Sequence, residues 1–166
     1  MKIGLISDTH GYLDERVFHH FEKCDEIWHA GDIGENGVLK RLNDFRLTKA
    51  VYGNIDSSNY QRELPEYEVL VREGVKVLMI HIGGKPPKYS RGVRALILDH
   101  KPHLFICGHS HILKVEMDKT LNTLYMNPGA AGKQGFHKMR TLLRFELRQG
   151  NIENLEVIEL GLRAKA

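Results

Sequence analysis

Short apolar runs that alternate with amphipathic segments are the feature that most constrains how this chain folds. Five of these runs are rich in branched residues and are bounded by Gly or Asp, which is typical of buried strands. They span residues 3–7, 26–30, 50–53, 75–81 and 104–108. Three segments between them space their apolar residues at helical intervals, at residues 14–23, 35–45 and 91–100. Strand–helix alternation predicts parallel strands covered by helices, with Asp14 and Ser90 as N-caps of the first and third helix.

The pattern changes after His111, where four further strands are predicted with turns between them. They span residues 112–117, 123–127, 141–147 and 155–160. A helix-rich first half and a hairpin-rich second half predict two packed sheets with helices outside. We expect one α/β domain over residues 1–166, because 166 residues suffice for one sizeable core and are few for two.

The composition excludes several classes of protein. With 42% hydrophobic and 27% charged residues, the chain is of the ordinary globular type. A net charge of +3 indicates no dedicated nucleic-acid surface, and no apolar run approaches the ~20 residues of a membrane span. The first apolar run is too short for a signal peptide. Cys24 and Cys107 lie in or beside apolar stretches, so we expect two reduced thiols and a cytoplasmic protein.

Polar residues that bind metals follow each of the five buried strands. They are Asp8 and His10, Asp32, Asn54 and Asp56, His81, and His109 and His111. The carboxyl ends of parallel strands meet at one edge of a sheet, so these side chains are expected to lie together. Each group alone is also explained by turn chemistry or by a buried histidine. Their repeated position, in three cases after Gly, favours a site.

The types of ligand indicate the class of metal. Carboxylate, imidazole and amide groups without thiolate favour Mn²⁺, with Fe, Zn²⁺ or Ni²⁺ as alternatives. The candidates comprise three Asp, four His and one Asn, which is more protein ligands than one catalytic ion takes. Two divalent ions that share a carboxylate would use them, in the arrangement that clamps a phosphoryl group during displacement.

This order of motifs, Asp8-x-His10, Gly31-Asp32, Gly53-Asn54, His81 and Gly108-His109-x-His111, resembles the calcineurin-like metallophosphoesterases. The short length and the segment 126–129 resemble their small YfcE-type branch. The resemblance implies a four-layer αββα sandwich of two mixed sheets flanked by helices. It also implies hydrolysis of a phosphodiester by a hydroxide that bridges two ions.

The resemblance further implies a role for each matching residue. Asp8, His10, Asp32 and His111 would hold the first ion, and Asp32 would bridge to a second ion held by Asn54, His81 and His109. The catalytic residues would be Asp32, Asn54 and His81. Many relatives carry a proton-donating histidine after the Asn, where this chain has Ile55, so we expect a preference for easily expelled leaving groups. Relatives also show His-Gly where this chain has His81-Ile82-Gly83-Gly84.

Two other functions compete with a phosphodiesterase acting on a small phosphorylated substrate. One is a scaffold like the retromer subunit of this fold, and the other is a nuclease on nucleic acid ends. The chain could also form a homo-oligomer. Two basic segments complete the candidates: Lys85, Lys88, Arg91 and Arg94, and then Lys133, His137, Lys138 and Arg140. The first either attracts an anionic substrate or, as we favour, is a solvated loop; the second either borders the pocket or is a turn.

Overall fold

Two five-stranded mixed sheets form the centre of the molecule in the computed structural model, which describes residues 1–164. The first sheet has the order β12-β11-β1-β2-β3, with bounds Asn151–Leu162, Met139–Arg148, Lys2–Ile6, Glu26–His29 and Thr48–Ala50. The second has the order β4-β5-β8-β10-β9, with bounds Tyr67–Arg72, Val75–Ile80, Leu104–Ile106, Thr123–Pro128 and Leu113–Asp118. A small hairpin pairs β6 (Gly84–Lys85) with β7 (Lys88–Tyr89).

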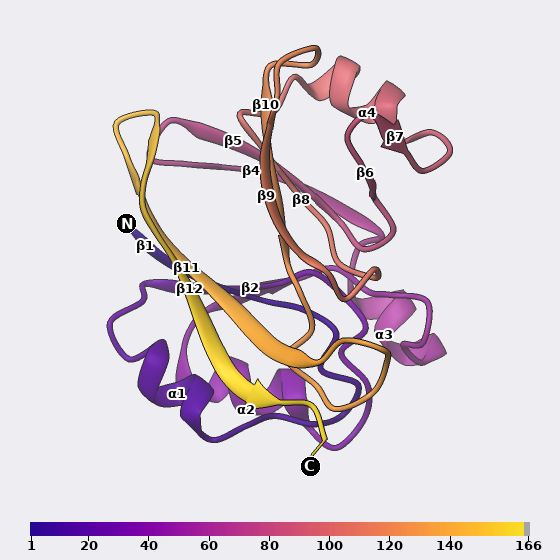
Figure 1. Cartoon of the computed structure of the whole chain (residues 1–166), viewed down its shortest axis with the longest axis vertical. Coiled ribbons are helices and arrows are strands. Elements are labelled where there is room, and N and C mark those ends of the chain that lie inside the picture. The colour runs from indigo at the N-terminus through magenta and orange to yellow at the C-terminus, as the bar shows by residue number, and fades with distance from the viewer. Residues whose placement is uncertain (165–166) are drawn as a thin grey trace.

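Helices cover the outer faces of both sheets, which confirms the predicted fold class (Figure 1). The helices are α1 (Arg16–His20), α2 (Val38–Phe45), α3 (Ser58–Glu63) and α4 (Val93–His100). Helices α1 and α2 lie against the first sheet, and α4 lies against the second at the opposite side of the molecule. No helix within residues 1–164 is long and apolar enough to cross a membrane.

Side-chain alternation along the strands creates three separate apolar layers. In β1, Leu5 packs into the layer between the sheets, whereas Ile6 packs outward against α1 and α2. Trp28 and Met79 lie in the predicted buried strands 26–30 and 75–81, and both are buried in the layer between the sheets. The third layer joins α4 to the outer face of the second sheet. Cys24 and Cys107 are buried and unpaired.

Parallel pairing occurs in both sheets and directs five strand ends toward one edge of the sandwich. Strand β1 runs parallel to β2, and β2 runs parallel to β3. Strands β5 and β10 both run parallel to β8. The sequence predicted parallel strands but did not divide them between the two sheets. The loops that follow β1, β2, β3, β5 and β8 carry the predicted ligands.

Several local predictions were wrong. Helix α4 has its N-cap at Gly92 rather than Ser90, and α1 begins after Glu15. Asp14 instead forms ion pairs with Arg16 and Arg140. Helix α3 was not predicted because none of its residues is buried, so it lacks an apolar period. Three further strands were also not predicted, namely β4, β6 and β7.

Candidate metal centre

Backbone hydrogen bonds between the strand-end loops position the candidate ligands. The amide of Asp8 donates to the Gly31 carbonyl, and the amide of His10 donates to the Asp32 carbonyl, each at 3.0 Å. Across the two sheets, the amide of His109 donates to the carboxylate of Asp8 at 3.2 Å. The loops of both sheets are therefore fixed relative to one another.

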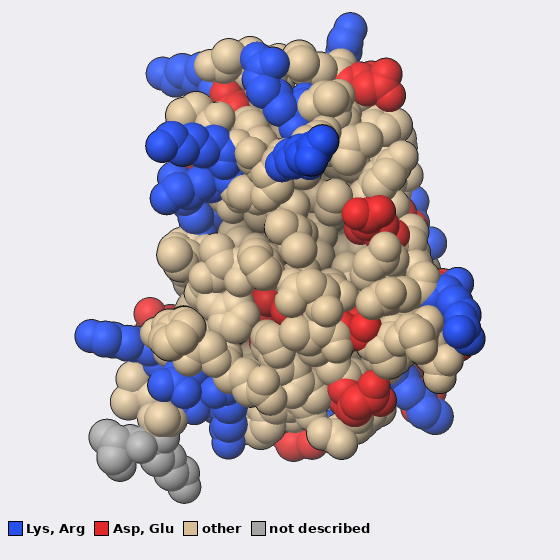
Figure 2. Space-filling view, turned by 90° about the vertical axis from the view of Figure 1, so that its right-hand side faces the viewer, with Lys and Arg blue, Asp and Glu red and all other residues tan. Residues whose placement is uncertain are grey.

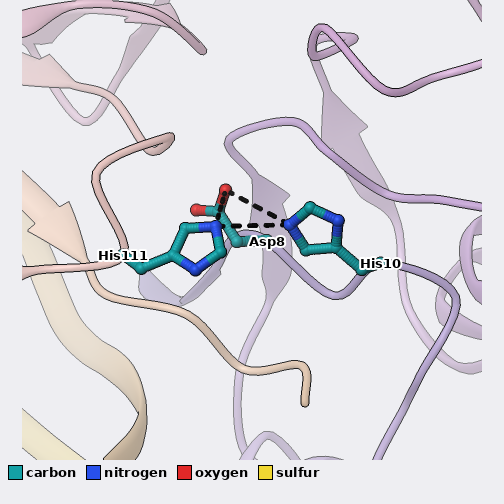
Figure 3. A group of neighbouring side chains, drawn as sticks. All are labelled: Asp8, His10 and His111. Atoms are coloured by element: carbon teal, nitrogen blue, oxygen red, sulfur yellow. Dashed lines mark hydrogen bonds and ion pairs between the residues drawn. The ribbon is translucent and has the colours of Figure 1, made fainter. Parts of the chain in front are cut away.

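The first group of candidate ligands contains Asp8, His10 and His111 (Figure 3). The Nε2 atom of His111 lies 3.2 Å from Asp8 Oδ1 and 3.3 Å from His10 Nε2. The Nε2 atom of His10 lies 4.0 Å from Asp8 Oδ1. The three side chains come from two loops, after β1 and after β8, and their ligand atoms point toward one another.

The second group contains Asp32, His81 and His109. Asp32 Oδ1 lies 3.1 Å from His81 Nε2, and its other carboxylate oxygen lies 3.7 Å from His10 Nε2. Asp32 therefore faces both groups with one oxygen each. This is the position that a carboxylate shared by two ions requires, although the role of Asp32 as a bridge stays a prediction.

The buried polar atoms of this centre fit a cation. Asp8 and Asp32 are almost fully buried, and a buried carboxylate is costly unless a positive charge or hydrogen bonds compensate it. Among the described residues, neither Asp8 Oδ1 nor His81 Nε2 has a hydrogen-bond partner, although His81 Nε2 lies 3.1 Å from Asp32 Oδ1. Two divalent ions would satisfy these lone pairs.

Hydrogen bonds on the outer side of two histidines leave their inner nitrogens free to bind an ion. The Nδ1–H group of His81 donates to the Ala30 carbonyl at 2.7 Å, so Nε2 carries the lone pair. His137 Nε2–H donates to the Gly132 carbonyl at 3.1 Å, so its Nδ1 accepts from His111 Nδ1–H at 3.3 Å. His111 Nε2 therefore also carries a lone pair that points into the first group.

The position of His137 argues against a role as proton donor to the leaving group. Both of its ring nitrogens are engaged, one by Gly132 and one by His111. The segment after Asn127-Pro128-Gly129 does border the site at His137. Arg140 of the same segment points away from it and pairs with buried Asp14.

Strained backbone marks the same positions. Five of the seven predicted ligands, Asp8, His10, Asp32, His109 and His111, have φ values between 47° and 67°. Such values are uncommon outside glycine and cost on the order of 1–3 kcal/mol each. Strain that gathers at potential ligands indicates a functional site, because packing alone gives no reason to retain it.

The electrostatics of the centre favour bound positive charge. Burial lowers the pKa of His81, but the carboxylates of Asp32 and Asp8 outweigh burial and raise it above its ordinary value. Burial raises the pKa of Asp32, but the contact with His81 outweighs it and lowers the pKa. Burial also lowers the pKa of His10, which keeps this imidazole neutral and able to bind an ion.

Asp56 is not part of either group, although it follows a strand like the other candidates. Its buried carboxylate accepts from the amides of Ile33 at 3.2 Å, Gly34 at 2.8 Å and Gly53 at 2.8 Å. Asp56 thus joins the loop that carries Asp32 to the loop that carries Asn54. Asn54 itself is exposed and lines a cavity of about 380 Å³ together with Gly53 and His81.

His29 is a functional candidate that the sequence did not reveal. It is fully buried in β2, where its Nδ1 accepts from the Gly31 amide at 3.2 Å. Its Nε2–H donates to Thr9 Oγ1 at 2.9 Å, and that hydroxyl donates to the Ile33 carbonyl. Burial lowers the pKa of His29 to about 4, so it is neutral and holds the loops without binding an ion.

The fold and the two ligand groups define a metal-binding α/β sandwich protein, and sequence comparison gives its family. A model of the calcineurin-like phosphoesterase superfamily domain matches residues 1–150. A probable metallophosphoesterase of Methanothermobacter thermautotrophicus is 31% identical over 138 residues, covering 78% of this chain and 77% of that protein. The chain belongs to the calcineurin-like phosphoesterase superfamily.

Solved structures share the fold along nearly the whole chain. An archaeal phosphodiesterase matches with a TM-score of 0.77 and 21% identity, covering 96% of this chain and 100% of its own. Vps29 of Chaetomium thermophilum matches with a TM-score of 0.76 and 16% identity, covering 96% of this chain and 97% of its own. At these identities the likeness concerns the fold alone.

Proposed function

We propose that the protein is a metal-dependent phosphodiesterase that hydrolyses a small phosphodiester at a centre of two divalent ions. The observation that carries the proposal is the pair of ligand groups, with one Asp32 oxygen directed at each. Asp8, His10, Asp32 and His111 would hold one ion, and Asp32, Asn54, His81 and His109 the other. Mn²⁺ fits these ligands best, and Fe, Ni²⁺ and Zn²⁺ are the alternatives.

The residues of the centre would bind and orient the phosphoryl group. Bound divalent ions would lower the pKa of water and neutralise charge on the phosphoryl oxygens. Asp32 would be shared by the two ions, while Asn54 and His81 would be direct ligands of the second ion. The buried carboxylates and the strained loops hold these groups in place before substrate binds, which avoids reorganisation during the reaction.

Exposed apolar side chains around the centre support a diester with apolar or aromatic ester groups. Ile55, Ile82 and Ile112 are exposed, and each directly follows a predicted ligand. Phe136 is fully exposed in the loop before His137, in the same cavity as Ile112. Ile55 cannot donate a proton to the leaving group, which favours aryl esters over alkyl esters.

The proposal is tested with bis(p-nitrophenyl) phosphate and with Mn²⁺, Zn²⁺, Ni²⁺ or Fe²⁺ added to metal-free protein. Asp32→Asn should lower turnover by roughly three orders of magnitude, because Lewis-acid stabilisation is worth several kcal/mol. It should also weaken the binding of both ions. Asp44→Asn is the matched control, because Asp44 is exposed and pairs with Lys40 on α2. One ion per chain in fully active protein would contradict the dinuclear centre.

A scaffold function is the second candidate, and the structural similarity to Vps29 is the observation that favours it. A scaffold would hydrolyse no phosphoester with any of the four metals, even where metal raises its melting temperature. His111→Ala separates the two functions further. It should abolish turnover in an enzyme and leave the fold cooperative, because the strand-end loop adds little to the apolar layers.

A further inference from the structure

The β6–β7 hairpin lies beside the second ligand group, and hydrogen bonds hold its base in place. The Tyr125 hydroxyl donates to the Gly84 carbonyl at 2.9 Å, and the Ser90 amide donates to the Gly83 carbonyl at 3.1 Å. The Tyr89 hydroxyl donates to Asp118 at 2.5 Å. Tyr125 is buried, so the base of the hairpin is fixed to the second sheet.

Gly84, the second glycine of the sequence His81-Ile82-Gly83-Gly84, allows this hairpin to form. Gly84 has a φ of 72°, and a Cβ atom there would lie 2.6 Å from the Ser90 amide nitrogen. Any other residue would push the two strands of the hairpin apart. The departure from the His-Gly pattern of relatives therefore has a structural consequence: it places Lys85 and Lys88 on a fixed hairpin.

A cavity of about 290 Å³ lies between this hairpin and the loop that carries His109. The cavity is bordered by Lys85 and Lys88 of the hairpin, by Lys114 of β9, and by His109 and Ser110 of the loop after β8. Because His109 belongs both to this cavity and to the second ligand group, the cavity adjoins the metal centre.

The charge on the cavity wall is positive and largely uncompensated. Of its three lysines, Lys114 pairs with Glu116 at 2.6 Å, whereas within residues 1–164 Lys85 and Lys88 form no salt bridge. No carboxylate is among the residues that line the cavity. Figure 2 shows the side of the molecule that lies on the right in Figure 1. Lys and Arg side chains gather on its upper part, where β6, β7 and α4 lie in Figure 1.

We propose that this cavity binds a second anionic group of the substrate. This group is a phosphate monoester on the ester group of the diester that is not the leaving group. The inference rests on the proposed phosphodiesterase function and specifies its substrate class. Two free lysines on an anchored hairpin suit a compact phosphate, for which lysine serves as a point charge. For Lys85 and Lys88 the proposal takes the alternative that the sequence left open, attraction of an anionic substrate, over the solvated loop.

A pair of chromogenic substrates tests the proposal on the full-length, Mn²⁺-loaded protein. The p-nitrophenyl ester of thymidine 5′-phosphate and its 3′-phosphorylated derivative share one leaving group and differ only in the second phosphate. The 3′-phosphorylated ester should show a KM lower by about tenfold, which corresponds to about 1.4 kcal/mol. The double variant K85M/K88M should bring the two KM values together by raising the KM of the 3′-phosphorylated ester.

The double variant K23M/K119M is the matched control, because it removes the same charge at exposed positions outside the cavity. It should keep the tenfold difference, whereas its loss there would attribute the preference to net charge and overturn the proposal. Equal KM values for both esters in the wild-type protein, or a preference that survives in K85M/K88M, would also overturn it. These results leave the phosphodiesterase function intact. Hydrolysis of neither ester would overturn that function and the inference with it.

Discussion

Replacement of Asp56 by Asn tests whether the ligand loops are held together by one buried carboxylate. The side chain accepts three backbone amides, from Ile33, Gly34 and Gly53, and it contacts no predicted ligand side chain through a hydrogen bond. Asn is nearly the same size but has one accepting oxygen in place of two. If that oxygen takes the position of Oδ2, the Asn amide group faces the Gly34 amide, and two donors oppose each other.

The magnitude follows from the number and type of hydrogen bonds. Bonds to a charged acceptor contribute about 1.5–3 kcal/mol each and neutral ones about 0.5–1.5 kcal/mol. In Asp56→Asn, the hydrogen bonds from Ile33 and Gly53 change from a charged to a neutral acceptor, and the buried Gly34 amide is left unpaired. Together these changes predict a loss of about 3 kcal/mol in the free energy of unfolding. Solvent does not reduce this effect, since Asp56 is 4% exposed.

Urea unfolding of metal-free protein measures this loss. Trp28 is the single tryptophan and is fully buried between the sheets, so its fluorescence reports global unfolding. Asp56→Asn should also require more Mn²⁺ for half-maximal turnover, because the loops of Asp32 and Asn54 are held together by fewer and weaker hydrogen bonds. Asp99→Asn, at an exposed position on α4, is the matched control and should change stability by less than about 0.5 kcal/mol.

The reasoning would be refuted if Asp56→Asn unfolded within about 0.5 kcal/mol of the wild type. A variant with wild-type stability and wild-type metal affinity but no turnover would indicate a different role. In that case Asp56 would act on the substrate directly, rather than through its three backbone hydrogen bonds.

Three further perturbations have defined outcomes. Gly53→Ala should abolish turnover, because its Cβ would lie 2.1 Å from Asp32 Oδ1; wild-type activity would contradict this close approach. Ile55→His should raise turnover of alkyl diesters relative to aryl diesters by about 10²-fold or more, and an unchanged ratio would mean that another group already donates the proton. Asp14→Asn should lower the free energy of unfolding at pH 7 by about 3 kcal/mol, since Asp14 and Arg140 form a buried pair. Hydrogen bonds from arginine hold the pKa of Asp14 below its ordinary value. Its contribution is therefore present above about pH 4 and is lost as the pH falls through the lowered pKa; a wild-type advantage that persisted in strong acid would contradict this assignment.

The sequence by itself determined the fold class and the order of the candidate ligands. Both follow from local patterns. Short branched runs form strands wherever they lie in the fold, and a polar residue directly after such a run lies at a strand end. Asp8, Asp32 and His81 were identified in this way. The family could be recognised for the same reason, because its motifs are short and keep their order along the chain.

Only the tertiary structure decided which neighbouring polar residues face the centre. Asp56 and Asn54 lie two residues apart, yet the Asp56 carboxylate turns to backbone amides of another loop. His29 and His137 act through partners 20 and 26 residues away in sequence, which no local pattern encodes. The contact of Lys85 and Lys88 with the cavity beside His109 likewise depends on how the hairpin packs on the second sheet. The direction of a side chain depends on long-range packing and on which buried polar groups still need a hydrogen-bond partner. Both are defined only once the two sheets have packed together.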